Sequence, residues 1–225
     1  MTEVNRSAAI GLIRFHVLLL ALVFLPAWSL HYWQGWVCLL VFSASAFGIT
    51  IYLARKNPAL LARRMNAGPK AETEKTQKVI QMFAAVAFAS VFVLSSLDHR
   101  FGWSKAPLAV VIAGNLLIAL GFAFVFWVFK VNTFTSATIE VARDQQVITS
   151  GPYAIVRHPM YLGSLVMLAG IPLSLGSLWG LLTIVLMAAL IVLRLLDEER
   201  FLARNLAGYG AYTGRVHYRL APFIW

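Results

Sequence analysis

A run of 36 residues without a charged side chain constrains this chain more than any other feature. It spans residues 158–193 and contains no Asp, Glu, Lys or Arg. One α-helix of that length would measure about 54 Å, against about 30 Å for the hydrocarbon core of a bilayer. Pro172 and Gly176 lie near its middle, where residues that break helices are expected. The run therefore predicts a hairpin of two short membrane helices, 161–175 and 178–193.

The glycines of this run have a second interpretation. Gly176 and Gly180 are four residues apart, and small residues at this spacing pack membrane helices closely against each other. Their place in the middle of the run favours a turn, and both interpretations remain open from the sequence.

The rest of the chain also indicates an integral membrane protein. Hydrophobic residues make up 60% of the 225 residues and charged ones only 12%, about half the usual charged fraction of a soluble domain. This composition excludes an ordinary cytosolic enzyme, a disordered tail and a small secreted domain. We predict an all-α integral membrane protein, a single multi-pass domain over 1–225 with about six membrane segments. Besides the hairpin, the segments are 13–30, 33–53, 79–97 and 107–129.

The positive charges predict the orientation in the membrane. Of the 19 Lys and Arg residues, 17 fall at the N-terminus, in 54–78, in 130–157 and from residue 194 onward, and two fall in 98–106. Cytoplasmic loops carry such an excess. Both termini are therefore expected in the cytoplasm. Because the basic residues alternate with long apolar runs, this pattern argues against binding to nucleic acid.

The segment 54–78 carries seven basic residues together with Leu60, Leu61 and Met65. It could form an amphipathic helix that lies on an anionic membrane surface. It could equally be a solvated loop that only sets the orientation. Both interpretations are kept.

Polar residues are sparse, and they gather in two clusters, 145–161 and 194–219. The predicted hairpin begins at one cluster and ends at the other, and a hairpin returns to the side that it left. The two clusters are therefore expected to meet at one cytoplasmic interface.

Two features of these clusters point to a site. Arg194 and Glu198 share a helix face four residues apart, and ionisable groups next to a membrane segment are costly and usually functional. His158 stands directly before Pro159, which favours the start of a helix; it serves either as a site residue or as a hydrogen-bonded anchor. No motif indicates a metal centre, a serine hydrolase or a Rossmann unit.

These residues resemble a known family. Gly-Pro-Tyr at 151–153, Arg-His-Pro-Met-Tyr-Leu-Gly at 157–163 and the pair Glu198-Glu199 are similar to the isoprenylcysteine carboxyl methyltransferase family and to the related membrane phospholipid methyltransferases. The resemblance covers about 130–225, which would be the methyltransferase core. Residues 1–129 match only as N-terminal membrane spans.

The resemblance implies an enzyme that transfers a methyl group from S-adenosyl-L-methionine to a lipidic substrate at the cytoplasmic face, leaving S-adenosyl-L-homocysteine. Arg194 would then bind the substrate carboxylate as the catalytic residue. Thr138 and Gln145 depart from the residues of eukaryotic members. The residues expected to bind the cofactor are Gln145, Gln146, Val147, Ile148, Tyr153, His158, Pro159, Met160, Tyr161 and Glu198.

Several activities fit this inventory. A carboxyl O-methyltransferase that acts on a prenylated cysteine or a similar amphiphile is favoured, because Arg194 suits an anionic head group. A phospholipid N-methyltransferase is the main alternative, and a non-enzymatic membrane scaffold is the third. The expected partners are the lipid bilayer and a lipidic or prenylated small substrate, with neither metal nor nucleic acid. The oligomeric state is left open.

Overall fold

The computed structural model describes residues 3–72 and 74–225. Within these residues the chain is helical, with no strand and one isolated bridge between Val156 and Tyr218. The elements are α1 (Glu3–Ala27), α2 (Trp33–Lys56), α3 (Pro58–Met65), α4 (Lys75–Phe101), α5 (Leu108–Val131), the 3-10 turn η1 (Gly151–Ala154), α6 (Pro159–Ser174), α7 (Leu181–Asn205) and α8 (Tyr209–Arg215).

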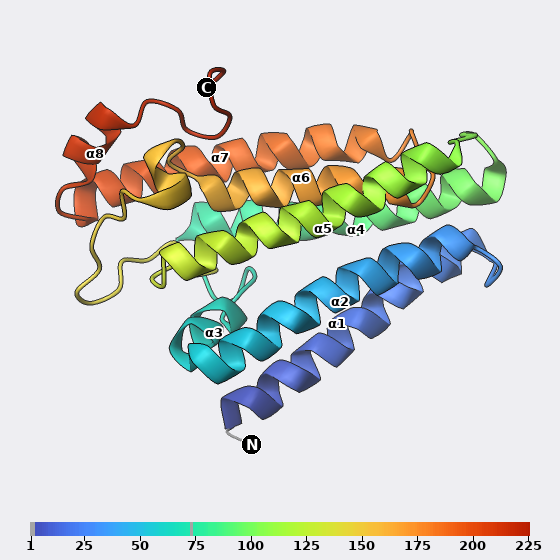
Figure 1. The fold of residues 1–225 in the computed structure, drawn as a ribbon, viewed down its shortest axis with the longest axis horizontal. Helices are drawn as coiled ribbons and strands as arrows, with labels where there is room; N and C mark the ends of the chain where they lie inside the picture. Colours follow the sequence, from blue (N-terminus) through green and yellow to red (C-terminus); the bar gives the residue numbers. More distant parts are fainter. Residues whose placement is uncertain (1–2, 73) are drawn as a thin grey trace.

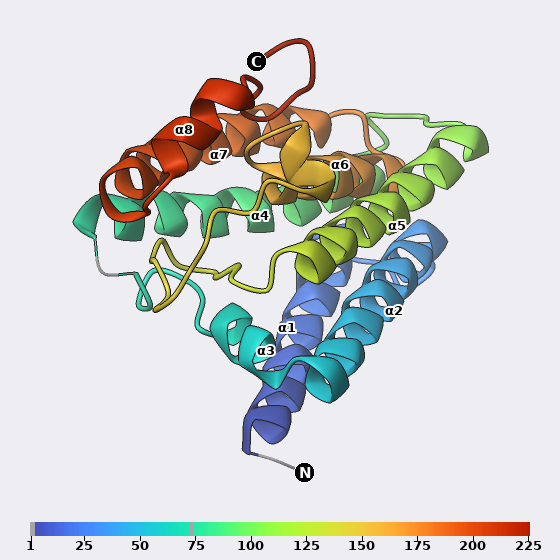
Figure 2. The same cartoon turned by 60° about the vertical axis from the view of Figure 1, so that its left-hand side comes forward.

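The long helices form two groups. Helices α4 to α7 lie alongside one another, and α1 and α2 run as a pair that crosses beneath them (Figures 1 and 2). Helices α1, α2, α4 and α5 are long and apolar enough to cross a membrane, and α6 is a shorter apolar helix. The prediction of an all-α, multi-pass membrane protein is confirmed.

The first helix differs from its predicted bounds. It begins at Glu3 rather than at residue 13, and the early residue Ala8 is buried against α3. It ends at Ala27 because Trp28 adopts a left-handed backbone with φ 53°.

The predicted hairpin is present as α6 and α7. Helix α6 ends at Ser174, and Gly176 follows with φ 73°, a conformation that glycine adopts without steric cost. Gly180 has the second role considered above. A β-carbon at Gly180 would lie 2.6 Å from Pro172 Cβ and overlap the Ser95 hydroxyl of α4. Gly176 thus makes the turn, and Gly180 allows close packing of the helices.

Glycine also brings α5 and α6 together, the pair of helices in most extensive contact. A β-carbon at Gly121 would lie 2.6 Å from the backbone nitrogen of Met167, and one at Gly170 would lie 2.6 Å from the carbonyl oxygen of Gly114. The two backbones therefore touch along their length, as small residues allow in membrane helices.

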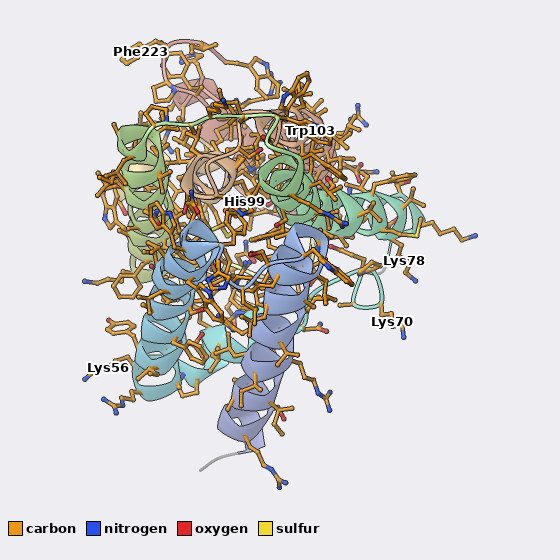
Figure 3. The ribbon with its side chains drawn as sticks, turned by 90° about the vertical axis from the view of Figure 1, so that its right-hand side faces the viewer. Lys56, Lys70, Lys78, His99, Trp103 and Phe223 are labelled. Carbon is orange, nitrogen blue, oxygen red and sulfur yellow. The ribbon has the colours of Figure 1, made fainter. Side chains whose placement is uncertain are left out.

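The turns at one end of the bundle are tied together by a buried carboxylate. Asp98 is 1% exposed and accepts hydrogen bonds from the hydroxyls of Ser104 (2.7 Å) and Ser177 (2.5 Å). Figure 3 looks onto this end, where His99 lies in the last turn of α4 and Trp103 follows it. Asp98 thus anchors both the α4–α5 turn and the α6–α7 turn.

The basic segments lie at the opposite end, with α3, the 132–150 segment and α8 (Figure 1). Lys56, Lys70 and Lys78 project away from the helices there (Figure 3). Within 54–78 the chain does form a short amphipathic helix, α3, but Leu60 and Leu61 on it are buried inside the protein. The predicted amphipathic helix is therefore present, with Leu60 and Leu61 packed inside the protein and Met65 exposed. Its contact with a membrane surface stays a prediction.

Candidate functional site

A polar cleft lies where the two polar clusters meet. Pro159 begins α6, and the residues just before it are tied to the C-terminal segment: the backbone nitrogens of Arg157 and His158 donate to the carbonyls of Tyr218 and Arg219, both at 2.9 Å. The end of α7 and helix α8 close the other side. The hairpin thus brings together residues about 40 positions apart, as its geometry predicted.

All ten residues expected at the cofactor line this one cleft of about 100 Å³. They come from the 132–150 segment, η1, α6 and α7, with His158 directly before α6. Thr138 lines it as well, whereas Arg194 does not. The other lining residues are Asn132, Phe134, Thr135, Ser136, Ile139, Glu140, Arg157, Leu202, Leu206, Tyr209 and Tyr212.

Tyr161 connects the two charged residues that were predicted to act together. Its hydroxyl donates to Glu198 Oε2 (2.6 Å) and accepts from Arg194 Nε (3.1 Å). Within the described ranges, no ion pair joins Arg194 directly to Glu198. The i, i+4 pair is therefore bridged by a tyrosine from the other arm of the hairpin.

The guanidinium of Arg194 is held mainly by a segment that the sequence did not connect to the site. Glu72 forms an ion pair with Nη2 at 2.7 Å, and the side-chain oxygen of Gln77 accepts a hydrogen bond from Nη1 at 2.9 Å. Nη2 also donates to the carbonyl of Ala137 at 2.8 Å. Glu72 and Gln77 are 3% and 1% exposed. The only hint in the sequence was that Glu72 is one of two acids in a basic stretch.

Glu199 has different partners from its neighbour Glu198. It forms ion pairs with Arg157 Nε (2.7 Å) and Arg219 Nε (2.9 Å), and His158 Nε2 lies 3.3 Å away. Burial alone would raise the pKa of Glu199, but the hydrogen bonds from His158 and Arg219 and the charge of Arg157 lower it to about 2. Glu199 is thus an ionised anchor that holds the C-terminal segment and His158 in place.

Several polar groups of the cleft can still bind a ligand, although Glu140 already accepts from the Ser136 hydroxyl and Glu198 from that of Tyr161. Glu140 and Glu198 contribute carboxylates, and the buried hydroxyl of Tyr209 has no hydrogen-bond partner among the described residues. Burial raises the pKa of Tyr209, so the hydroxyl stays a neutral donor. In the described part of the chain, no backbone carbonyl accepts from the N–H groups of residues 146–149. This set offers carboxylates to a cation and backbone donors to a planar polar ring.

A second, apolar cleft of about 540 Å³ lies between the spans. Residues of α1, α2, α3, α5 and α6 line it. The polar cleft borders it near Met160, which packs against a buried cluster that includes Leu61 and Phe129. In residues 3–72 and 74–225, no group of three or more His, Cys, Asp or Glu side chains could hold a metal ion.

Comparison with known proteins shows which family part of the chain is similar to. Residues 109–208 match the phospholipid methyltransferase family. The match covers 100 of the 225 residues, and this part of the chain is similar to that family. The match takes in α5 to α7 and ends directly before α8. It confirms the resemblance seen in the sequence and begins about 20 residues earlier than predicted.

One curated relative carries a different activity in its name. The chain is 34% identical over 91 residues to the Delta(14)-sterol reductase of Mus musculus, which covers 39% of this chain and 22% of the relative. The matched region is thus about a fifth of that protein's length. The chain is therefore similar both to a methyltransferase family and to part of a protein named as a reductase.

Proposed function

We propose that the protein transfers a methyl group from S-adenosyl-L-methionine to the carboxylate of a lipidic substrate at the cytoplasmic face of a membrane. One observation carries the proposal. The ten residues predicted for the cofactor line a single polar cleft, and that cleft adjoins an apolar one between the spans. A water-soluble donor and a lipidic acceptor would then reach a common boundary from different sides.

The side chains of the polar cleft suit this cofactor. Glu198, fixed by Tyr161, would bind the ammonium group of the donor, and Glu140 adds to the negative potential near the sulfonium. The unused backbone N–H groups of 146–149 and the apolar Val147 and Leu202 suit an adenine ring. When bound, the cofactor supplies a methyl group on a positively charged sulfur, ready for displacement. Since the cleft has only about 100 Å³ of free volume, we expect the 132–150 segment to move outward on binding.

The chain's own residues then mainly position the reactants. A carboxylate acceptor is ionised at pH 7 and needs no general base, so alignment and exclusion of water supply the acceleration. Arg194 has one N–H left after its four hydrogen bonds. We assign it a positioning role through Tyr161 and Glu198, because Arg194 itself lines neither cleft.

Two other activities follow from particular observations. The name of the matching family favours a phospholipid amine as acceptor, which would have to lose a proton before attack. The sterol reductase relative favours a reduction of an apolar ring compound, which the apolar cleft could also hold.

Purified protein incubated with radiolabelled donor and a membrane lipid extract separates these activities. A methyl ester releases its label as methanol in mild base, whereas an N-methyl group does not. We expect base-labile label that depends on Glu198 and is lost in Glu198→Gln. Base-stable label would establish the amine activity. Absence of any transfer, together with reduction of a sterol by a nicotinamide donor, would overturn the methyltransferase proposal.

A further inference from the structure

The apolar cleft is built largely by the N-terminal half of the chain, outside the matched family segment. It is lined by Ala8 and Gly11 of α1, Leu53 of α2 and Leu61 of α3, together with Phe129 of α5. An apolar cleft between spans is open to any lipid. What gives this cleft chemical selectivity is the residue at its polar end.

That residue is Arg64, the only one of the cleft's lining residues, all within the described chain, to carry a charge. One of its N–H groups donates to the carbonyl of Ser136 at 2.5 Å, and the guanidinium lies over the ring of Phe129, 5.2 Å from its centroid. In the described residues no carboxylate lies within 4.0 Å of it. Arg194, by contrast, is paired with Glu72.

The surroundings of Arg64 favour a negative ligand. Burial lowers the pKa of its guanidinium, and the charge of the nearby Arg194 lowers it further, while Tyr161 and Glu198 oppose this shift at longer range than an ion pair. A partly buried cation without a carboxylate partner is stabilised when an anion binds, most strongly through two parallel hydrogen bonds. Arg64 has N–H groups left for such a fork, because only one hydrogen bond uses them.

Arg64 also stands at the boundary between the two clefts. Ser136, whose carbonyl holds Arg64, lines the polar cleft. Met160 lines the polar cleft as well and packs against the buried cluster that contains Leu61 and Phe129, both of which line the apolar cleft. A group bound by Arg64 would therefore lie next to the cofactor residues.

The apolar cleft is large enough for one lipid chain. Its volume is about 540 Å³, and apart from Arg64 it is lined mainly by apolar side chains.

We propose that this cleft binds the methyl acceptor as a single-chain amphiphile and that Arg64 binds its carboxylate. This inference rests on the proposed function only in calling the ligand a methyl acceptor, because binding of the ligand can be measured without methyl transfer. It assigns the N-terminal spans a part in substrate selection, besides anchoring.

The test compares an acid with its own uncharged ester. S-farnesyl-N-acetylcysteine and its methyl ester are titrated into the detergent-purified full chain, with Arg64→Gln and the matched control Arg63→Gln. Arg63 precedes Arg64 on α3 and likewise donates to a loop carbonyl, that of Thr133, yet it does not line the cleft. Wild type and Arg63→Gln are expected to prefer the acid about tenfold or more, and Arg64→Gln to lose this preference.

A second pair of variants tests whether the lipid chain of the ligand lies in the apolar cleft. A β-carbon at Gly11 or at Gly48 would meet nothing within 4 Å, so both positions accept a larger residue. Gly11 lines the apolar cleft and Gly48 does not. Gly11→Phe is expected to weaken binding of both the acid and the ester, while Gly48→Phe leaves both unchanged.

The outcomes separate this inference from the proposed function. Acid preference that survives in Arg64→Gln, or that is absent in wild type, overturns the assignment of Arg64. Tighter, Arg64-dependent binding of lysophosphatidylethanolamine overturns the carboxylate in favour of a phosphate. S-adenosyl-L-homocysteine is titrated in parallel. If it binds while neither farnesyl compound does, the inference fails and the proposed function stands. If S-adenosyl-L-homocysteine does not bind while Arg64 still selects the acid, the inference stands and the proposed function fails.

Discussion

The ion pair between Glu72 and Arg194 yields the most quantitative prediction. The Glu72 side chain is 1% exposed and that of Arg194 11%, and their charged atoms lie 2.7 Å apart. Removing one partner of a buried pair costs about 3–5 kcal/mol, because the other charge stays buried. In Glu72→Gln the new amide can still accept from the backbone nitrogen of Ile139, now 3.3 Å away. Arg194 also keeps its bond to Gln77. We therefore expect the lower end, about 3 kcal/mol.

A double-mutant cycle measures this value. Glu72→Gln, Arg194→Gln and the double variant are unfolded in detergent and compared with wild type. The account predicts a coupling of about 2 kcal/mol or more and a double variant that is more stable than the sum of the single effects implies. Glu74→Gln, an exposed acid two residues on, serves as control and should change stability by less than about 0.5 kcal/mol. Additive effects, or equal losses in Glu72→Gln and Glu74→Gln, would refute the reasoning.

Three further predictions concern packing, pH and the site. Gly121→Leu should destabilise the protein by about 2 kcal/mol or more, because its side chain would meet the backbone of α6. Gly11→Leu should not destabilise it, since the space around Gly11 is open. Equal unfolding temperatures of the two variants would contradict the packing described. Glu199 has its folded pKa lowered from 4.5 to about 2, so it stabilises the fold above pH 4.5, and that stability should fade as the pH falls toward 2. Unfolding temperatures from pH 6 to 3 should fall less steeply in Glu199→Gln, and parallel curves would count against the assignment. Tyr161→Phe removes the hydroxyl between Arg194 and Glu198 and should weaken S-adenosyl-L-homocysteine binding about tenfold, measured by calorimetry; an unchanged affinity would show that the bridge has no part in the site.

The sequence predicted the parts of the fold that depend on local rules. The charge-free run 158–193 had to turn back because a single helix of that length cannot fit the bilayer, and Gly176 marks the turn. The convergence of the two polar clusters followed from that hairpin. The ten residues predicted to bind the cofactor could be named because the resemblance covers this continuous core.

The contacts of the 54–78 segment could not be predicted in the same way. Which helix a connecting segment docks on is a tertiary question, and Glu72 and Arg64 carry no local signal of their destination. The i, i+4 spacing of Arg194 and Glu198 correctly placed them on one face, yet it could not show that Tyr161 lies between them. Periodicity describes one helix at a time, while this site depends on residues from several.

Calorimetric titration of the detergent-purified protein with S-adenosyl-L-homocysteine tests the central claim most directly. The account predicts binding of one molecule per chain, a loss of about tenfold or more in Glu198→Gln, and no change in Glu74→Gln, whose side chain is exposed and lies outside the polar cleft. A well-folded wild type that does not bind the compound, or a Glu198→Gln variant that binds it equally well, would contradict the assignment of the polar cleft as the cofactor site.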